Sequence, residues 1–74
     1  MKVRLFGILA EKAGTDLIDV DAHSTTDIIK ELGAHINDLS NYSFSIAVDR
    51  KIIYGDVVLS GNEELAVLPP FAGG

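Results

Sequence analysis

The sequence contains no cysteine and no tryptophan, and its 74 residues include only one methionine and two prolines. Without cysteine the chain has no disulfide framework, no thiol nucleophile and no thiolate ligands for a zinc or iron–sulfur centre. No apolar run approaches the roughly 20 residues that a membrane-spanning helix needs. The first residues also lack the long apolar segment and the cleavage site of a secretory signal peptide. From these absences we expect a single domain over residues 1–74, without membrane contact, in the cytoplasm.

Positive charge is also scarce, because six Lys and Arg residues stand against eleven Asp and Glu residues, for a net charge of −5. A nucleic-acid-binding protein normally carries the opposite sign, so the composition argues against that class. The two histidines, His23 and His35, do not have the spacing of a metal site. Gly7 and Gly14 lack the spacing of a Walker or dinucleotide-binding loop. We therefore expect no bound metal, no bound cofactor and no autonomous active site.

Strand patterns occupy both ends of the chain. The first nine residues are rich in apolar side chains, and Ile18 and Val20 alternate with acidic residues, which favours two strands joined as an antiparallel hairpin by a short link. Alternation returns at Phe44, and Asp49-Arg50 suits a turn before a short edge strand and its loop. Strands are thus predicted over residues 1–9, 15–21, 44–48 and 64–68, and a short edge strand plus a loop over residues 51–59.

One helix is predicted between the second and third strands, from about Thr25 to about Ile36. Ser24 and its neighbours offer hydroxyls that cap a helix start, and Asp27 suits the first turn of the helix dipole. The apolar residues that follow form one stripe at helical spacing. The order of elements predicts an α+β domain with a mixed sheet and one main helix packed across one face. Among small folds this order best matches the β-grasp, or ubiquitin-like, arrangement.

The last predicted strand ends at Pro69-Pro70, where the missing amide donors stop a sheet ladder and favour polyproline II geometry. Residues 70–74, if extended, reach roughly 16 Å at about 3.3 Å per residue. Gly73 and Gly74 have no Cβ atom and therefore pass through a narrow channel in almost any conformation. A terminal Gly-Gly alone also fits a frayed end. After an apolar strand and a diproline, we instead expect residues 69–74 to form a flexible tail that presents the Gly74 carboxylate.

Residues 66–74, Ala-Val-Leu-Pro-Pro-Phe-Ala-Gly-Gly, resemble the C-terminal signature of the molybdopterin synthase small subunit and of related ubiquitin-like sulfur carriers. Leu5-Phe6, Leu9, Glu11 and Gly14 resemble that family's first strand and the turn after it. The likeness spans the whole chain, and the tail is its specific part.

The resemblance implies a non-catalytic sulfur-donor subunit. A ubiquitin-activating-type adenylyltransferase would use ATP to activate the Gly74 carboxylate, and a sulfur donor protein would then convert it to a thiocarboxylate. The molybdopterin synthase large subunit would receive the tail, and the sulfur would pass to the pterin precursor of the molybdenum cofactor. By position, Gly74 carries the sulfur and Gly73 fits the channel. The residues expected to contact the partner groove are Pro69, Pro70, Phe71, Ala72 and Gly73.

Other functions stay open at this point. Asp49-Arg50 replaces the Asn-Gly type of turn found in many relatives, and residues 61–64 differ from the Gly-Asp-Glu common before the last strand. The diproline favours the molybdopterin pathway, but a carrier for thiamine thiazole or another pathway is an alternative. A protein modifier joined through Gly74 to lysines, or a noncovalent binding module, would also have this fold.

The first predicted strand has apolar residues on both faces, with Leu5 opposed to Phe6 and Ile8. One face must therefore leave apolar side chains outside the core unless loops cover them. An exposed patch of this kind suits the docking of a partner subunit.

Overall fold

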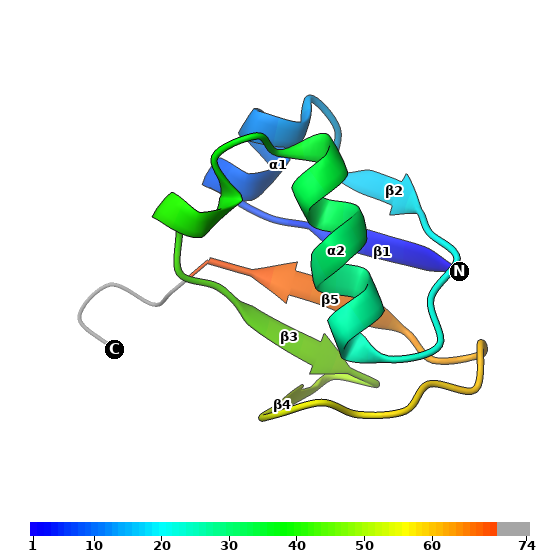
Figure 1. Ribbon diagram of the computed structural model, residues 1–74. Helices are drawn as coiled ribbons and strands as arrows, with labels where there is room; N and C mark the ends of the chain where they lie inside the picture. The colour runs from blue at the N-terminus through cyan, green and yellow to red at the C-terminus, as the bar shows by residue number, and fades with distance from the viewer. Residues whose placement is uncertain (70–74) are drawn as a thin grey trace.

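Residues 1–69 are described in a computed structural model of the chain (Figure 1). Five strands form one sheet in the order β2-β1-β5-β3-β4. The central pair, β1 and β5, runs parallel, and the other neighbours run antiparallel. The predicted mixed sheet is therefore confirmed. The strands are β1 (Lys2–Leu5), β2 (Leu17–Asp19), β3 (Ser45–Val48), β4 (Lys51–Ile53) and β5 (Leu65–Leu68).

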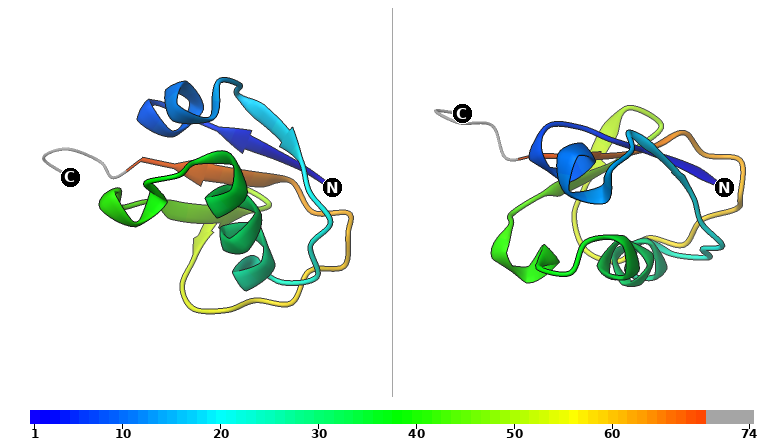
Figure 2. Two further views of the ribbon diagram at one scale, coloured as in Figure 1. Left: turned by 45° about the horizontal axis from the view of Figure 1, so that its top comes forward. Right: turned by 90° about the horizontal axis from the view of Figure 1, so that it is seen from above.

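The main helix, α2 (Thr25–His35), packs across one face of this sheet (Figure 2). It begins at Ser24, whose Oγ accepts a hydrogen bond from the Asp27 N–H at 3.4 Å. Asp27 in turn accepts from the His23 N–H at 2.9 Å, so both cap groups satisfy amides that the helix start leaves free. Ile36 ends the helix one residue after His35. The predicted helix and its capping residues are confirmed.

The core lies between α2 and the sheet. Along β1 the side chains of Val3 and Leu5 are buried while Lys2 and Arg4 are exposed, as the two-residue period of a strand requires. The apolar stripe of α2 covers the buried side. The largest fully buried side chains come from every layer and are Leu5, Leu9, Ile28, Leu32, Ile36, Leu65, Val3, Val67 and Thr25.

The prediction of a strand over residues 1–9 is wrong in its second half. β1 ends at Leu5, and a short helix, α1 (Ile8–Ala13), follows Gly7. Leu9 lies on this helix and its side chain is fully buried in the core, so the apolar residue that suggested a strand is the core-facing residue of a helix. β1 and β2 do pair antiparallel, as predicted, but α1 connects them instead of a short link. A second short helix, η1 (Leu39–Asn41), lies between the predicted helix and the strand predicted from residue 44.

The turn predicted at Asp49-Arg50 connects β3 and β4. Both residues have positive φ, 51° and 69°, which is the backbone of a two-residue hairpin turn whose twist suits the flanking strands. Asp49 tolerates this conformation better than most residues and accepts a hydrogen bond from the Glu64 N–H at 2.9 Å. An Asp-Arg pair thus performs the turn that Asn-Gly performs elsewhere.

The segment after β4 is tied to the first turn of α2 through Thr25, which is 2% exposed. Its Oγ1 accepts from the Val57 N–H at 2.9 Å and donates to the Asp56 carboxylate at 3.1 Å. Asp56 also accepts from the Thr26 N–H at 3.0 Å, and this bond lowers the pKa of the Asp56 carboxyl. One buried hydroxyl therefore joins the β4–β5 connection to the helix.

Substitution Thr25→Val is expected to destabilise the domain by about 1–3 kcal/mol, because it leaves the Val57 N–H without an acceptor while keeping the side-chain shape. Urea unfolding followed by circular dichroism measures the change. Thr15→Val is the control: the Thr15 hydroxyl also bonds backbone atoms, those of Leu17, but water reaches them, so loss of this hydroxyl should change the unfolding free energy by less than about 0.5 kcal/mol. Equal midpoints for the two variants would show that the Thr25 hydroxyl contributes nothing beyond shape.

Candidate functional site

The tail predicted to carry the chemistry starts directly after β5. Pro69 is half-buried and follows Leu68, the last residue of that strand. Pro70, Phe71, Ala72, Gly73 and Gly74 lie outside the described residues. The structure therefore locates the root of the predicted tail at the end of a central strand of the sheet.

The face of the sheet opposite α2 carries a row of side chains that spans four strands. The row alternates with core residues such as Leu5 and Val67, so it points away from the helix. Two of its members are alanines, whose short side chains leave the centre of this face recessed. In register, the row is Arg4, Ala66, Ala47 and Ile52.

Larger apolar side chains stand around these alanines and enclose a hollow of about 370 Å³. Phe6 is 44% exposed and Ile52 is 38% exposed, and Leu68 completes the apolar margin. Ile8 is 39% exposed, so both apolar residues expected outside the core are exposed, but they lie beyond β1: Phe6 precedes Gly7 and Ile8 begins α1. We call this surface the open-face hollow; it is lined by Arg4, Phe6, Ala47, Arg50, Ile52, Glu64, Leu65, Ala66 and Leu68.

Charged groups stand at the rim of the open-face hollow. The Arg50 Nε lies 3.1 Å from a Glu64 carboxylate oxygen, and both side chains are largely exposed. An exposed pair of this kind contributes little to stability, so both groups are available to a partner. Arg4 lines the hollow from β1. The hollow thus combines an apolar floor with two guanidinium groups in an otherwise acidic chain.

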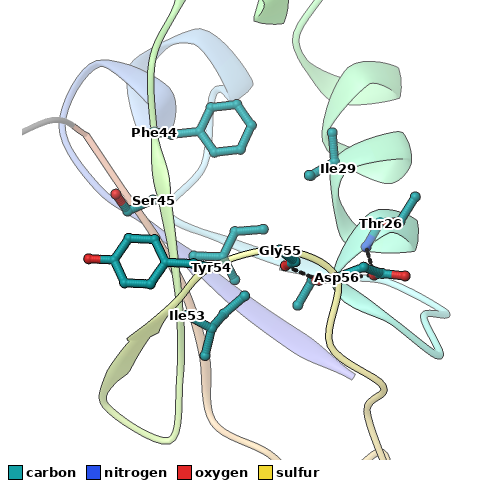
Figure 3. Close-up of a pocket in the computed structure, with 10 residues that line it drawn as sticks. Thr26, Ile29, Phe44, Ser45, Ile53, Tyr54, Gly55 and Asp56 are labelled. Atoms are coloured by element: carbon teal, nitrogen blue, oxygen red, sulfur yellow. Dashed lines mark hydrogen bonds between the residues drawn. The ribbon is translucent and has the colours of Figure 1, made fainter.

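A second hollow of about 420 Å³ lies between α2 and the β3–β4 pair (Figure 3). Ile29 and the Phe44 ring face each other across it, while the Tyr54 ring points away from the helix and is 88% exposed. Its polar end is Asp56, whose carboxylate already accepts the bonds from α2 described above. Sequence reasoning did not single out this hollow, because its walls come from segments that meet only in the fold.

The other candidate groups do not assemble into a site within residues 1–69. No group of three or more His, Asp or Glu side chains is placed to hold a metal ion there, and His23 and His35 lie exposed at opposite ends of α2. None of the helices in this part of the chain has the length and apolar character needed to cross a membrane.

Among the described residues, Glu63 is the carboxyl with a strongly shifted pKa, and its role is structural. The Ser60 N–H donates to it at 2.8 Å and the Gly61 N–H at 2.9 Å, which lowers its pKa to about 2. These bonds stabilise the ionised form and close the turn before β5. The shift therefore marks a turn and not an acid–base catalyst.

Comparison with known proteins places this geometry in a family. The model of the ThiS family matches residues 3–74. None of the curated proteins matches the chain.

Solved structures share the fold at low identity. Small archaeal modifier protein 1 from Methanosarcina acetivorans superposes with a TM-score of 0.82 at 24% identity, over 99% of this chain and 94% of that one. Small archaeal modifier protein 1 from Haloferax volcanii gives 0.80 at 20% identity, over 95% of each chain. A putative molybdopterin converting factor, subunit 1, from Pyrococcus furiosus gives 0.77 at 22% identity, also over 95% of each chain.

These structural matches establish the predicted β-grasp fold, in which one main helix packs on a mixed five-stranded sheet. The family match extends over nearly the whole sequence, including the tail. The chain therefore belongs to the ThiS family, and its fold is ubiquitin-like.

Proposed function

We propose that the chain carries sulfur as a thiocarboxylate on Gly74 and donates it in molybdopterin biosynthesis as the small subunit of the synthase. The observation that carries the proposal is the ThiS-family match, which continues through Gly74. The likeness to a putative molybdopterin converting factor subunit supports the choice of pathway. The diproline before the tail favours the same choice.

The chemistry needs only the terminal carboxylate from this chain. A carboxylate oxygen of Gly74 attacks the α-phosphorus of ATP in the adenylating partner, and pyrophosphate leaves. The resulting acyl-adenylate has a good leaving group, which the carboxylate lacks. The terminal sulfur of a persulfide on the donor protein then attacks the acyl carbon, and AMP leaves, which gives an acyl disulfide to the donor. A second thiol of the donor attacks the inner sulfur of this S–S bond, so the donor ends as a disulfide and the thiocarboxylate is released. The product is a sulfur nucleophile on a chain that has no cysteine.

The open-face hollow is the surface that docks the partner enzymes in this proposal. Its floor is apolar and its rim carries Arg4 and Arg50, so it fits a partner with an apolar side chain beside an acidic group. Leu68 lines the hollow and Pro69 follows it, which places the root of the tail beside the docked partner. From there a reach of roughly 16 Å suffices to enter an active site in that partner.

A protein modifier is the second candidate, and a specific observation favours it. Two of the structures that share the fold are named small archaeal modifier proteins. In that function Gly74 would be activated in the same way, and the acyl group would pass to a lysine amine instead of gaining sulfur.

Intact-mass spectrometry distinguishes these functions. The chain is incubated with the adenylating enzyme of its own organism, ATP and a sulfur donor protein. We expect a mass increase equal to the replacement of one oxygen by sulfur, located in the C-terminal peptide. An unchanged terminus beside an enzyme proven active would reject the carrier function, and adducts on lysines would support the modifier.

The thiocarboxylated chain then decides the pathway. Mixed with the synthase large subunit and the pterin precursor, it is expected to yield molybdopterin. Transfer to thiazole synthase alone would assign the carrier to thiamine synthesis.

A further inference from the structure

Gly7 lies where β1 ends and α1 begins, in a backbone conformation that requires glycine. Its φ is 60° and its ψ is −136°, a combination that L side chains rarely adopt. Its carbonyl oxygen accepts from the Glu11 N–H at 3.2 Å and so starts the helix. The residue thus turns the chain out of the sheet after a single strand.

The Pro69 ring packs against Gly7 where a side chain would otherwise stand. A Cβ atom added to Gly7 would lie 3.1 Å from Pro69 Cγ and 3.6 Å from Pro69 Cβ. The parallel register explains this meeting, because Leu5 is level with Val67 and two further residues along each chain bring Gly7 beside Pro69. Proline has no N–H group to donate to the sheet, so at this position the two segments are joined by the contact of the Pro69 ring with Gly7 and not by a backbone hydrogen bond from Pro69.

We propose that Gly7 is a positioning residue for the tail: having no side chain, it seats the Pro69 ring against the end of β1 and so fixes where residues 70–74 begin. This inference rests on the proposed function of Gly74. Phe6 and Leu68, the neighbours of the two residues in contact, both line the open-face hollow. The Gly7–Pro69 contact therefore fixes the position of the start of the tail relative to the docking surface.

This position matters because the Gly74 carboxylate must reach the active site of a partner that is bound at the hollow. A displacement of about 1 Å in a reacting group can lower a rate by about 100-fold while binding is unchanged. A side chain at Gly7 would push Pro69 away from β1, so the tail would leave the sheet at a different point from the one that a docked partner meets.

The chain offers a matched control in Gly14, at the other end of α1. Its φ is also positive, at 77°, but its ψ of 12° is left-handed helical, a region that alanine enters at lower cost than the conformation of Gly7, and no atom lies within 4 Å of the added Cβ. Gly14→Ala therefore controls for a positive φ at one end of α1, and the double variant Gly7→Ala/Pro69→Ala, which keeps the strain at Gly7 but relieves the contact, separates strain from displacement of Pro69.

The test is ATP–pyrophosphate exchange catalysed by the adenylating enzyme of the source organism, with the full chain as the varied substrate. Gly7→Ala is expected to lower kcat about 10- to 100-fold with KM within about twofold, whereas Gly14→Ala keeps both values near wild type. Gly7→Ala/Pro69→Ala, which removes the Cγ atom that clashes, is expected to regain the kcat of Pro69→Ala alone. Equal kcat values in Gly7→Ala and Gly14→Ala, or a change in KM alone, would overturn the inference.

Nuclear magnetic resonance of the free chain tests the contact without any enzyme. Nuclear Overhauser effects are expected between the Gly7 Hα atoms and the Pro69 ring, and Gly7→Ala should shift the amide signals of residues 66–68 while Gly14→Ala should not. Absence of these effects in the wild type would overturn the inference. Failure of the wild type to support exchange, with the contact present, would instead reject the proposed function.

Discussion

Deletion of Gly73 and Gly74 is expected to lower ATP–pyrophosphate exchange by at least about 100-fold, to the background of the assay. The shortened chain still ends in a carboxylate, now on Ala72, but that group falls short by about 7 Å at 3.3–3.6 Å per residue. It also carries a Cβ atom into a channel that we expect to admit only glycine. Misplacement on this scale removes the gain from correct orientation of the reacting groups.

The deletion has two controls. The urea midpoint should be unchanged, because the core described within residues 1–69 is complete without Gly73 and Gly74. Gly74→Ala keeps the length and the carboxylate and adds only one methyl group, so a partial loss of exchange is expected. Full exchange by the deleted chain would show that the tail is not the reacting group and would favour a noncovalent binding module.

Phe6→Asp is expected to raise the Kd for the adenylating enzyme and for the synthase large subunit about 10- to 100-fold. Phe6 is an exposed aromatic side chain at the margin of the open-face hollow, the type of residue that dominates interface energies. Its replacement removes apolar contact and places an unpaired carboxylate in the interface. Isothermal titration calorimetry measures both affinities.

Two further variants test whether the weakening is specific to the open-face hollow. Ile52→Asp changes the opposite margin, on β4, and should weaken binding to a similar extent without touching the chain beside Gly7. Tyr54→Asp introduces the same charge beside the other hollow, where the Tyr54 side chain is 88% exposed, and should leave both Kd values within about twofold. Equal weakening by Tyr54→Asp would mean that the added negative charge, and not the surface, determines the effect.

These two predictions separate steps that one carrier must perform. The deletion removes the reacting carboxylate and leaves the docking surface, so binding should persist while exchange is lost. Phe6→Asp leaves the carboxylate and weakens docking, so exchange should recover at high concentration of the chain. The reverse pattern would contradict the assignment of docking to the hollow and of chemistry to the tail.

Local sequence signals predicted much of the fold. Ser24 and Asp27 form the cap that their side chains suggested, and the apolar stripe behind them faces the core. These predictions succeeded because capping and helical periodicity depend on neighbours within one or two turns. The turn at Asp49-Arg50 was recognisable for the same reason.

The segment after β1 shows where such reasoning stops. Ile8 and Leu9 extend an apolar run that suits a strand and a buried helix equally well. Gly7 turns the chain after β1, and the burial of Leu9 against α2 and the sheet makes a helix the better solution. That choice depends on the shape of the core, which no short window of sequence contains.

The sequence by itself determined the order of the five strands and the main helix, the cap of α2 and the proline and glycine content of the tail, because each depends on residues close together in the chain. Only the tertiary structure decided where the tail begins and what surrounds it. The parallel pairing of β1 with β5 brings Gly7 to Pro69, and the same register gathers Arg4, Ala66 and Ala47 into one row. Strand pairing sets these distances, and pairing between the first and the last strand is a property of the whole fold.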